Sequence, residues 1–308
     1  MIRSEDSAHR FHVLRCPQAS AITTAELLRE RAKLSRVYVV PAELLGREAW
    51  RRSTDQFSID LGEAAAPYVQ RELSNAIAIA DMQRDGMLKL GVSGGRSIFG
   101  LFNHLAVQHY ENLRVEIEAL VVGPVPHSLY SAMSIAELAV QKFVNANMNY
   151  IMNVSVDSGK FMLERIAIHR PQGLKEFDWF VLGIGGKESG SLTAHLATVQ
   201  HDEEVQARTV GDIMSRLFDA SGNELDEGKC NQFVQLSLKD LSDMARRGNR
   251  RVLVIAGGRN KVEPIAVILR KNPRLINFLI TDELTARMLI RDLRFAGSEG
   301  PEYEVSDS

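Results

Sequence analysis

Six short runs of apolar residues constrain the fold of this chain more than any other feature of its sequence. They span residues 37–40, 88–92, 119–123, 179–185, 252–257 and 278–281. Most are apolar almost throughout, which is typical of strands covered on both faces. Segments of helical character alternate with them, at residues 61–82, 97–109, 134–145 and 263–269. Strands and helices that alternate in this way predict an α/β fold: an open, mostly parallel, Rossmann-like sheet with helices on both faces.

One domain is expected to account for most of the chain. We place it at residues 11–296, between a short tail at 1–10 and a polar tail at 297–308. No internal repeat, low-complexity block or linker divides it. Residues 205–239 are less regular, and we interpret them as an insertion beside the functional site. A capping box at Thr23 and Glu26 predicts that an early helix spans residues 23–34.

Composition and charge argue against several classes of protein. The 37 Lys and Arg against 39 Asp and Glu give a net charge of −2, so no overall basicity indicates nucleic acid. The sequence has no run of about 18 apolar residues and no apolar signal core, which predicts a cytoplasmic protein without a membrane span. Cys16 and Cys230 are far apart and are interpreted as free thiols. The eight histidines are scattered, which argues against a metal site, and no dinucleotide or P-loop motif is complete, so no cofactor is predicted.

The first candidate loop follows the strand at 88–92 and precedes a helix. It contains Ser93, Gly94, Gly95, Arg96 and Ser97. Glycines allow the backbone to turn its N–H groups toward an anion, and the next helix adds its N-terminal partial charge. The serine hydroxyls and the arginine are suitable donors to phosphate. A tight turn with a capping serine explains the same residues, and the loop alone does not decide between the two.

A second loop and a fourth loop are more ambiguous. Gly185, Gly186 and Lys187 close the strand predicted at 179–185, and a glycine turn with a solvated lysine would explain them. Asp282 and Glu283 join the last strand to the last helix. Asp282 is suited to capping that helix, and its carboxylate is also suited to sugar hydroxyls.

The third loop gives a stronger anion signal. Gly257, Gly258, Arg259 and Lys261 lie between a strand and a helix within a few residues. In an open α/β sheet all strand-to-helix loops emerge at one edge, where ligands bind at the switch in strand order. The four loops should therefore converge, with cations for a phosphate and carboxylates for hydroxyls.

In this order, the loops resemble the effector-binding domain of SorC/DeoR-type bacterial transcriptional regulators. The segments that carry the likeness are 91–97, 183–185, 210–213 with 218–222, 255–261 with Ile265, and 279–286. The resemblance implies a fold similar to the glucosamine-6-phosphate deaminase and ribose-5-phosphate isomerase group. It also implies a phosphorylated sugar or polyol as effector, and a dimer or tetramer.

The chain departs from this family's pattern at several places. Ser97 stands where the family usually has Thr, and Arg96 is not a usual residue there. Gly211 and Asp212 match a family signature whose role neither charge nor spacing explains. Only about ten residues precede the domain, too few for the helix-turn-helix that reads DNA in the family. We therefore expect contact with DNA only through a helix-turn-helix outside this chain.

Two other functions remain open at this point. One is a sugar-phosphate isomerase, deaminase or lactonase on the related fold. Its general base would come from one of five residues, none marked by a motif: Asp212, Asp282, Glu283, Lys187 and Lys261. The other is direct operator binding, for which the basic cluster at 246–251 is the sole support and a solvated loop the simpler explanation.

Overall fold

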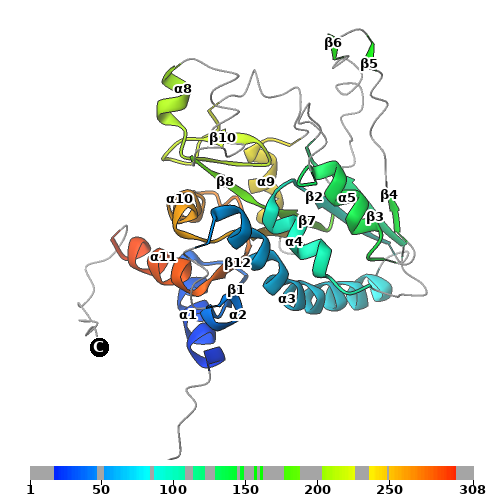
Figure 1. The fold of residues 1–308 in the computed structure, drawn as a ribbon, viewed down its shortest axis with the longest axis horizontal. Helices are drawn as coiled ribbons and strands as arrows, with labels where there is room; N and C mark the ends of the chain where they lie inside the picture. Colours follow the sequence, from blue (N-terminus) through cyan, green and yellow to red (C-terminus); the bar gives the residue numbers. More distant parts are fainter. Residues whose placement is uncertain are drawn as a thin grey trace, which may run out of the picture.

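A single parallel sheet forms the centre of the molecule. The computed structural model describes residues 17–46, 52–83, 87–107, 114–121, 129–143, 146–148, 156–157, 160–161, 177–187, 203–225, 236–247 and 250–295. Seven strands of the sheet lie in these ranges: β1 (Arg36–Val40), β2 (Met87–Val92), β3 (Arg114–Ala119), β4 (Ala146–Met148), β7 (Trp179–Leu182), β11 (Arg251–Ile255) and β12 (Phe278–Asp282). Their order is β1-β12-β11-β7-β2-β3-β4, and every pair is parallel (Figure 1). The α/β fold predicted from the apolar runs is confirmed.

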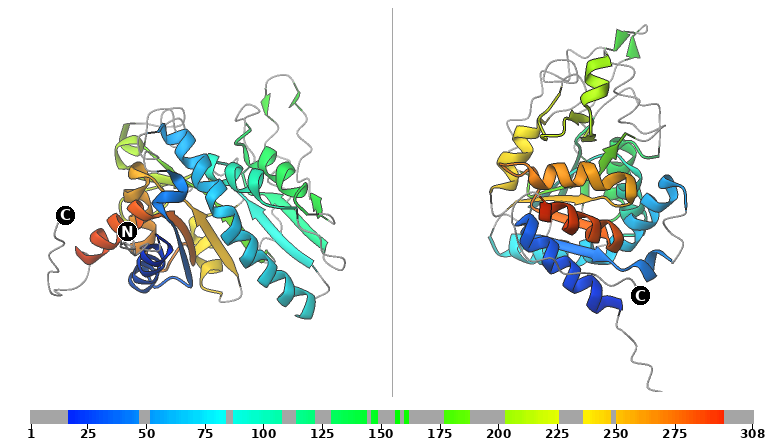
Figure 2. Two further views of the ribbon diagram at one scale, coloured as in Figure 1. Left: turned by 60° about the horizontal axis from the view of Figure 1, so that its bottom comes forward. Right: turned by 90° about the vertical axis from the view of Figure 1, so that its left-hand side faces the viewer.

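Helices cover both faces of this sheet. One layer contains α3 (Thr54–Gln83), α4 (Arg96–His104) and α5 (Ala132–Val140). The other contains α1 (Pro17–Ala32), α9 (Leu238–Ala245), α10 (Val262–Arg270) and α11 (Glu283–Phe295), and Figure 2 shows α10, α11 and α1 side by side. Strand residues alternate between the layers: Leu253 and Ile255 pack with the α3 layer, Val252 and Val254 with the α10 layer. Because helices cover both faces of the sheet, the four buried residues of β11, at 252–255, are all apolar.

The strand order reverses next to β7. From β2 the chain continues outward to β3 and β4, whereas from β7 it continues in the opposite direction to β11 and β12. The switch point therefore lies between β2 and β7, and β11 borders β7 on its other side. Ligands of open α/β sheets bind at such a point, outside the carboxyl ends of the strands.

A small antiparallel sheet lies beside the switch point. Its strands are β8 (Ile184–Gly186), β9 (Gly211–Ile213) and β10 (Arg216–Phe218), in the order β10-β9-β8. The predicted strand 179–185 was wrong as one strand, because it breaks at Gly183 and β8 leaves the main sheet. The segment 205–239, predicted to be less regular, contains most of α8 (Glu203–Arg208), then β9 and β10, and the first turn of α9. The remaining short elements are α2 (Ala42–Leu45), β5 (Val156–Asp157), β6 (Lys160–Phe161) and the 3-10 helix η4 (Arg259–Lys261).

Other predicted boundaries need correction. The strand predicted at 119–123 shares only Ala119 with β3, which ends there. The rest of β3 was missed because it carries Glu116 and Glu118. The helix predicted from Thr23 begins at Pro17, so Thr23 is internal and its hydroxyl donates to the Ala19 carbonyl at 3.1 Å. Helix α4 ends at His104, and α5 starts at Ala132 and ends at Val140. The two cysteines and both predicted tails at 1–10 and 297–308 lie outside the described residues. Among the described helices, none has the length and apolar character of a membrane span.

Candidate functional site

Side-chain hydroxyls tie the loops at the switch point to one another. Ser93 Oγ, just beyond β2, accepts a hydrogen bond from the Gly183 N–H beyond β7 at 3.1 Å. Ser97 Oγ donates to the Ile255 carbonyl of β11 at 2.8 Å. Both serines are buried. The three predicted loops therefore do meet at one edge of the sheet. In this structure the two serines connect these loops, and their predicted contact with an anion stays a prediction.

Two helices at this edge begin after a glycine, which supplies no side-chain cap. Helix α4 follows Gly95, which has φ of +126°, and η4 follows Gly258, which has φ of +92°. Neither start is capped by a side-chain hydrogen bond. The first N–H groups of a helix have no carbonyl partner within it, so these amides carry partial positive charge. A Cβ placed on Gly95 would meet no atom within 4 Å, so the start of α4 borders open space.

Other helices in the fold do have capped starts. Ser131 Oγ accepts from the Ser134 N–H at the start of α5, at 3.1 Å. Asp282 Oδ1 accepts from the Thr285 N–H at the start of α11, at 2.9 Å. Ser237 forms a complete capping box for α9. The uncapped glycine starts therefore follow β2 and β11, the two strands that flank β7.

Asp282 builds one of the glycine loops as well as capping α11. Its Oδ2 accepts from the Gly258 N–H at 2.9 Å and from the Thr285 hydroxyl at 2.6 Å. A Cβ on Gly257 would lie 2.3 Å from the same oxygen, which explains the glycine there. The predicted cap is confirmed, and contact of this buried carboxylate with a sugar hydroxyl stays a prediction.

Glu283 points into the junction of three helices. It accepts hydrogen bonds from Ser20 Oγ at 2.9 Å and Arg287 Nη2 at 2.7 Å, and from the Ala42 N–H at 3.4 Å. Burial by itself would raise the pKa of this carboxyl, but the hydrogen bonds from Arg287, Ser20 and Ala42 outweigh it and lower the pKa. In this arrangement Glu283 joins α1 to α11, so its predicted role in binding a ligand stays a prediction.

The predicted cations have different surroundings. Arg96 forms an ion pair with Asp55 of α3, with 2.8 Å between Nη2 and Oδ2. Lys187 Nζ donates to the Ala207 carbonyl of α8 at 3.2 Å. Arg259 is exposed on η4, and Lys261 is buried in the same turn. Arg96 and Arg259 thus lie on the two uncapped loops, whereas Lys187 contacts α8.

Two further segments of this site carry no signal in the sequence. The loop before α5 contributes the Tyr130 carbonyl, which accepts from the Gly95 N–H at 2.8 Å. The Arg96 guanidinium lies over the Tyr130 ring, 5.2 Å from its centroid. The first turn of α3 contributes Thr54 and Asp55. Neither segment has a glycine-rich loop, and only the topology brings them to this edge.

A close helix crossing fixes where α4 begins. A Cβ on Gly62 of α3 would lie 1.9 Å from the Ser97 carbonyl oxygen, and one on Gly100 of α4 would lie 2.2 Å from the Ile59 oxygen. Both neighbours are backbone atoms, so only glycine permits this approach. The crossing sets the first turn of α4 beside that of α3.

Gly211 and Asp212, whose role was open, form part of the small sheet. A Cβ on Gly211 would lie 2.7 Å from the Gly185 oxygen, so the pairing of β9 with β8 requires glycine. Asp212 Oδ2 accepts from the Ser215 N–H at 3.1 Å and closes the β9–β10 turn, where Met214 and Ser215 have positive φ. The signature therefore has a structural role in holding β8 next to the switch point.

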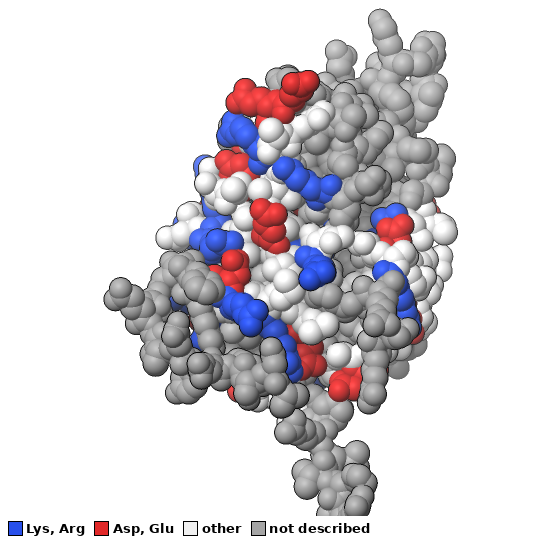
Figure 3. Space-filling model, turned by 60° about the vertical axis from the view of Figure 1, so that its left-hand side comes forward, with Lys and Arg blue, Asp and Glu red and all other residues white. Residues whose placement is uncertain are grey.

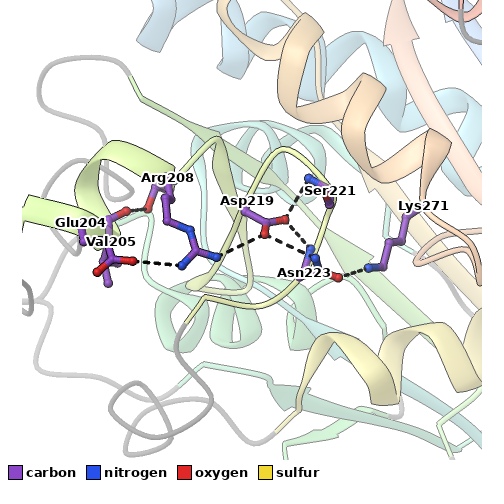
Figure 4. A network of polar contacts seen from close by, with 8 residues as sticks. Glu204, Val205, Arg208, Asp219, Ser221, Asn223 and Lys271 are labelled. Atoms are coloured by element: carbon purple, nitrogen blue, oxygen red, sulfur yellow. Dashed lines mark hydrogen bonds and ion pairs between the residues drawn. The ribbon is translucent and has the colours of Figure 1, made fainter.

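Polar contacts hold the far end of the small sheet (Figure 4). Asp219 Oδ1 accepts from the N–H groups of Ser221 and Asn223, both at 2.9 Å. Arg208 of α8 pairs with Asp219, and Lys271 beyond α10 donates to Asn223. Burial alone would raise the pKa of Asp219, but these hydrogen bonds and Arg208 lower it. The turn at 219–223 therefore connects α8 to the end of α10.

No cluster of three or more potential metal ligands occurs among the residues that the structure describes. The three carboxylates that were candidates for a general base stabilise the local structure. Asp212, Asp282 and Glu283 each accept a hydrogen bond from a backbone N–H.

Solved structures share this fold. A transcriptional regulator from Streptococcus pneumoniae TIGR4 matches with a TM-score of 0.64 at 21% identity, over 89% of this chain and 98% of that one. The full-length sorbitol operon regulator SorC from Klebsiella pneumoniae matches with a TM-score of 0.59 at 17% identity, over 94% of this chain and 84% of that one.

Sequence comparison supports the same relationship. The deoxyribonucleoside regulator of Bacillus subtilis (strain 168) is 28% identical over 219 residues, which cover 68% of this chain and 66% of that protein. The chain thus aligns with slightly less than two thirds of that regulator. A family model for a sugar-binding domain, Sugar-bind, matches residues 17–291. The resemblance seen in the ordered loops is confirmed, and the chain belongs to the Sugar-bind family of sugar-binding domains.

Proposed function

We propose that the domain binds a phosphorylated sugar or polyol at the carboxyl edge of its sheet, as the effector of a transcriptional regulator. The observation that carries this proposal is the pair of uncapped glycine starts, at Gly95 and Gly258, on either side of β7. Backbone N–H groups at a helix start are well suited to a phosphate, and Arg96 and Arg259 add positive charge nearby. Family membership supports the sugar, and the helix starts support the phosphate.

The regulatory role rests on the relatives. The matched proteins are named as transcriptional regulators, among them the deoxyribonucleoside regulator of Bacillus subtilis and the sorbitol operon regulator. We infer that this domain senses an effector and, as a dimer or tetramer, passes the signal to a DNA-binding part. On the face that carries α8, α10 and α11, Lys and Arg are interspersed with Asp and Glu (Figure 3), and Arg270 pairs with Asp292 there. This mixed charge does not favour direct binding of DNA by that face.

Binding without turnover fits the site better than catalysis. An isomerase or deaminase needs a carboxylate or amine that is able to exchange a proton with the substrate. Asp282 and Glu283 instead organise the starts of α11 and the neighbouring helices. We therefore propose a binding module rather than an enzyme.

A thermal-shift screen of matched phosphorylated and unphosphorylated sugars tests the proposal. A ligand at 100 times its Kd stabilises the folded state by about 2.7 kcal/mol, which corresponds to a Tm increase of roughly 5 °C. We expect this increase with phosphorylated ligands such as pentose, hexose and hexitol phosphates. Arg259→Ala should reduce it, and Arg270→Ala, on the exposed pair with Asp292, serves as the control. Indifference of the wild-type protein to every phosphorylated ligand would refute the proposal.

A further inference from the structure

The first turn of α3 is attached to both uncapped helix starts. Asp55 forms its ion pair with Arg96 at the start of α4. Thr54 Oγ1 lies 3.5 Å from Nδ2 of Asn260 in η4. Phe57 packs beside Gly258, since a Cβ on that glycine would lie 3.2 Å from the Phe57 ring. A single helical turn thus touches the two loops at which the phosphate is proposed to bind.

Asp55 brings a negative charge to the place where an anionic ligand is proposed to bind. Arg96 is the first residue of α4, and its guanidinium Nη2 lies 2.8 Å from the Asp55 carboxylate oxygen Oδ2. The positive field of the uncapped helix start and of Arg96 attracts any nearby anion. The Asp55 side chain is 60% exposed, so packing does not hold it in place. Its interaction with this field is therefore the contact that orients it.

The pair differs from the contacts of Asp60, a second acidic residue near the start of the same helix. Asp60 pairs with Arg52 and accepts a hydrogen bond from Gln56 Nε2 at 2.7 Å. Gln56 lies in α3 itself and Arg52 lies two residues before it, so both contacts are local. Asp55, in contrast, reaches across to a different helix. Arg96 also lies over the Tyr130 ring, which holds the guanidinium at the edge of the sheet whether or not Asp55 is bound.

We propose that Asp55 is an internal competitor for the phosphate of the effector and thereby a determinant of specificity. The inference rests on the proposed function. The Asp55 carboxylate occupies the Arg96 guanidinium in this structure, and a phosphate must replace it to use that guanidinium. A dianionic phosphate that also accepts hydrogen bonds from the α4 amides displaces Asp55, whereas a monoanion with fewer acceptors does not. Asp55 thus excludes weak anions and sets the effector concentration at which the site fills.

Substitution of Asp55 gives a distinctive pattern of affinities. We expect Asp55→Asn to tighten binding of the phosphorylated sugar found in the screen by about threefold to tenfold, because exposed ion pairs are weak and the removed charge also repels the ligand. Binding of inorganic phosphate and sulfate should tighten as well. Asp60→Asn, the matched control in the same helix, should leave all affinities unchanged. Isothermal titration calorimetry of the full chain measures each value.

A double-mutant cycle separates competition at Arg96 from a general change of charge. Arg96→Ala should weaken binding, and Asp55→Asn added to Arg96→Ala should improve it by less than twofold. Equal improvement with and without Arg96 would overturn the proposal, as would unchanged or weaker binding by Asp55→Asn alone. If the wild-type protein binds no phosphorylated sugar, the proposed function fails. The inference about Asp55 is then judged with inorganic phosphate, and it fails if Asp55→Asn does not bind that ion more tightly than the wild type.

Discussion

Four strand-to-helix loops of this protein form two contrasting pairs, although they emerge at the same edge of one parallel sheet. At the starts of α5 and α11, Ser131 and Asp282 accept the first helical N–H groups. At the starts of α4 and η4, Gly95 and Gly258 leave these groups without a side-chain acceptor. A side-chain cap contributes about 1 kcal/mol to stability. The two glycine loops forgo that contribution at the switch point, where an external anion is able to supply it.

The largest expected effect concerns the crossing that positions the uncapped start of α4. Gly100→Ala would place a Cβ 2.2 Å from the backbone oxygen of Ile59, so α3 and α4 must move apart. We expect a loss of about 3 kcal/mol in the free energy of unfolding, measured by urea denaturation. Asn103→Ala, on the exposed side of the same helix, is the control and should change it by less than about 0.5 kcal/mol. A loss below about 1 kcal/mol for Gly100→Ala would show that the close crossing is not required.

The next effect depends on pH and concerns β3, which leads toward the capped helix α5. Glu118 is 6% exposed and its Oε1 has no hydrogen-bond partner. Burial raises the pKa of Glu118 to about 7, and the repulsion from Glu116 adds to this while Lys89 opposes it. The folded state therefore favours the neutral acid. Its contribution to stability is fully present below the unfolded pKa and is lost as pH rises through about 7.

Substitution of Glu118 by Gln tests that dependence. Gln resembles the neutral acid at every pH, so the stability of the wild type relative to Glu118→Gln should fall by up to about 3 kcal/mol between pH 4.5 and 7.5. Urea unfolding of both proteins across this range measures the difference. Glu118→Met should remove the same pH dependence. Parallel stability profiles for wild type and Glu118→Gln would contradict the prediction.

The sequence predicted the strands and the glycine loops better than it predicted the contacts between loops. Runs of mostly apolar residues located β1, β2, β11 and β12, because strands buried on both faces leave a local signal. The same rule missed β3, whose alternating Glu116 and Glu118 resemble no buried strand. Glycine loops followed by helices were also visible locally.

Contacts between loops left no comparable signal. The serines of the first loop were predicted to face an anion, but Ser97 instead bonds to Ile255, 158 residues away. Asp55 and Tyr130 join the site through tertiary structure alone, and no local pattern marks them. The caps at Ser131 and Ser237 are contacts with residues three positions later in the chain, but of the three caps described above only that at Asp282 was predicted.

A smaller effect is expected at the capped start of α11. Asp282→Ala removes the acceptor for the Thr285 N–H and for the Thr285 hydroxyl, and one of the two acceptors of the Gly258 N–H. We expect a loss of about 2 kcal/mol in the free energy of unfolding, because buried donors are left without a partner. Asp282→Asn keeps one acceptor oxygen and should lose less. An unchanged stability of Asp282→Ala would mean that α11 does not depend on its cap, and the contrast between the two groups of loops would lose its energetic basis.

The smallest change in stability is expected when α4 is capped artificially. This substitution also tests most directly the contrast between capped and uncapped helix starts. Gly95→Asp places a carboxylate at a helix start where a Cβ has no atom within 4 Å. The cap and its charge stabilise the helix by about 1 kcal/mol, while the backbone of Gly95, with φ of +126° and ψ of 154°, lies in a region that costs other residues roughly 1–3 kcal/mol, so we expect a net loss of about 1 kcal/mol. Gly95→Ala carries the backbone strain without the charge and is the control. Because the carboxylate takes the place of a phosphate, Gly95→Asp should abolish binding of phosphorylated sugars in a calorimetric titration, and Gly95→Ala should retain part of it. If both variants bind equally well, the N–H groups of α4 are not the phosphate site, and the missing caps must have another explanation.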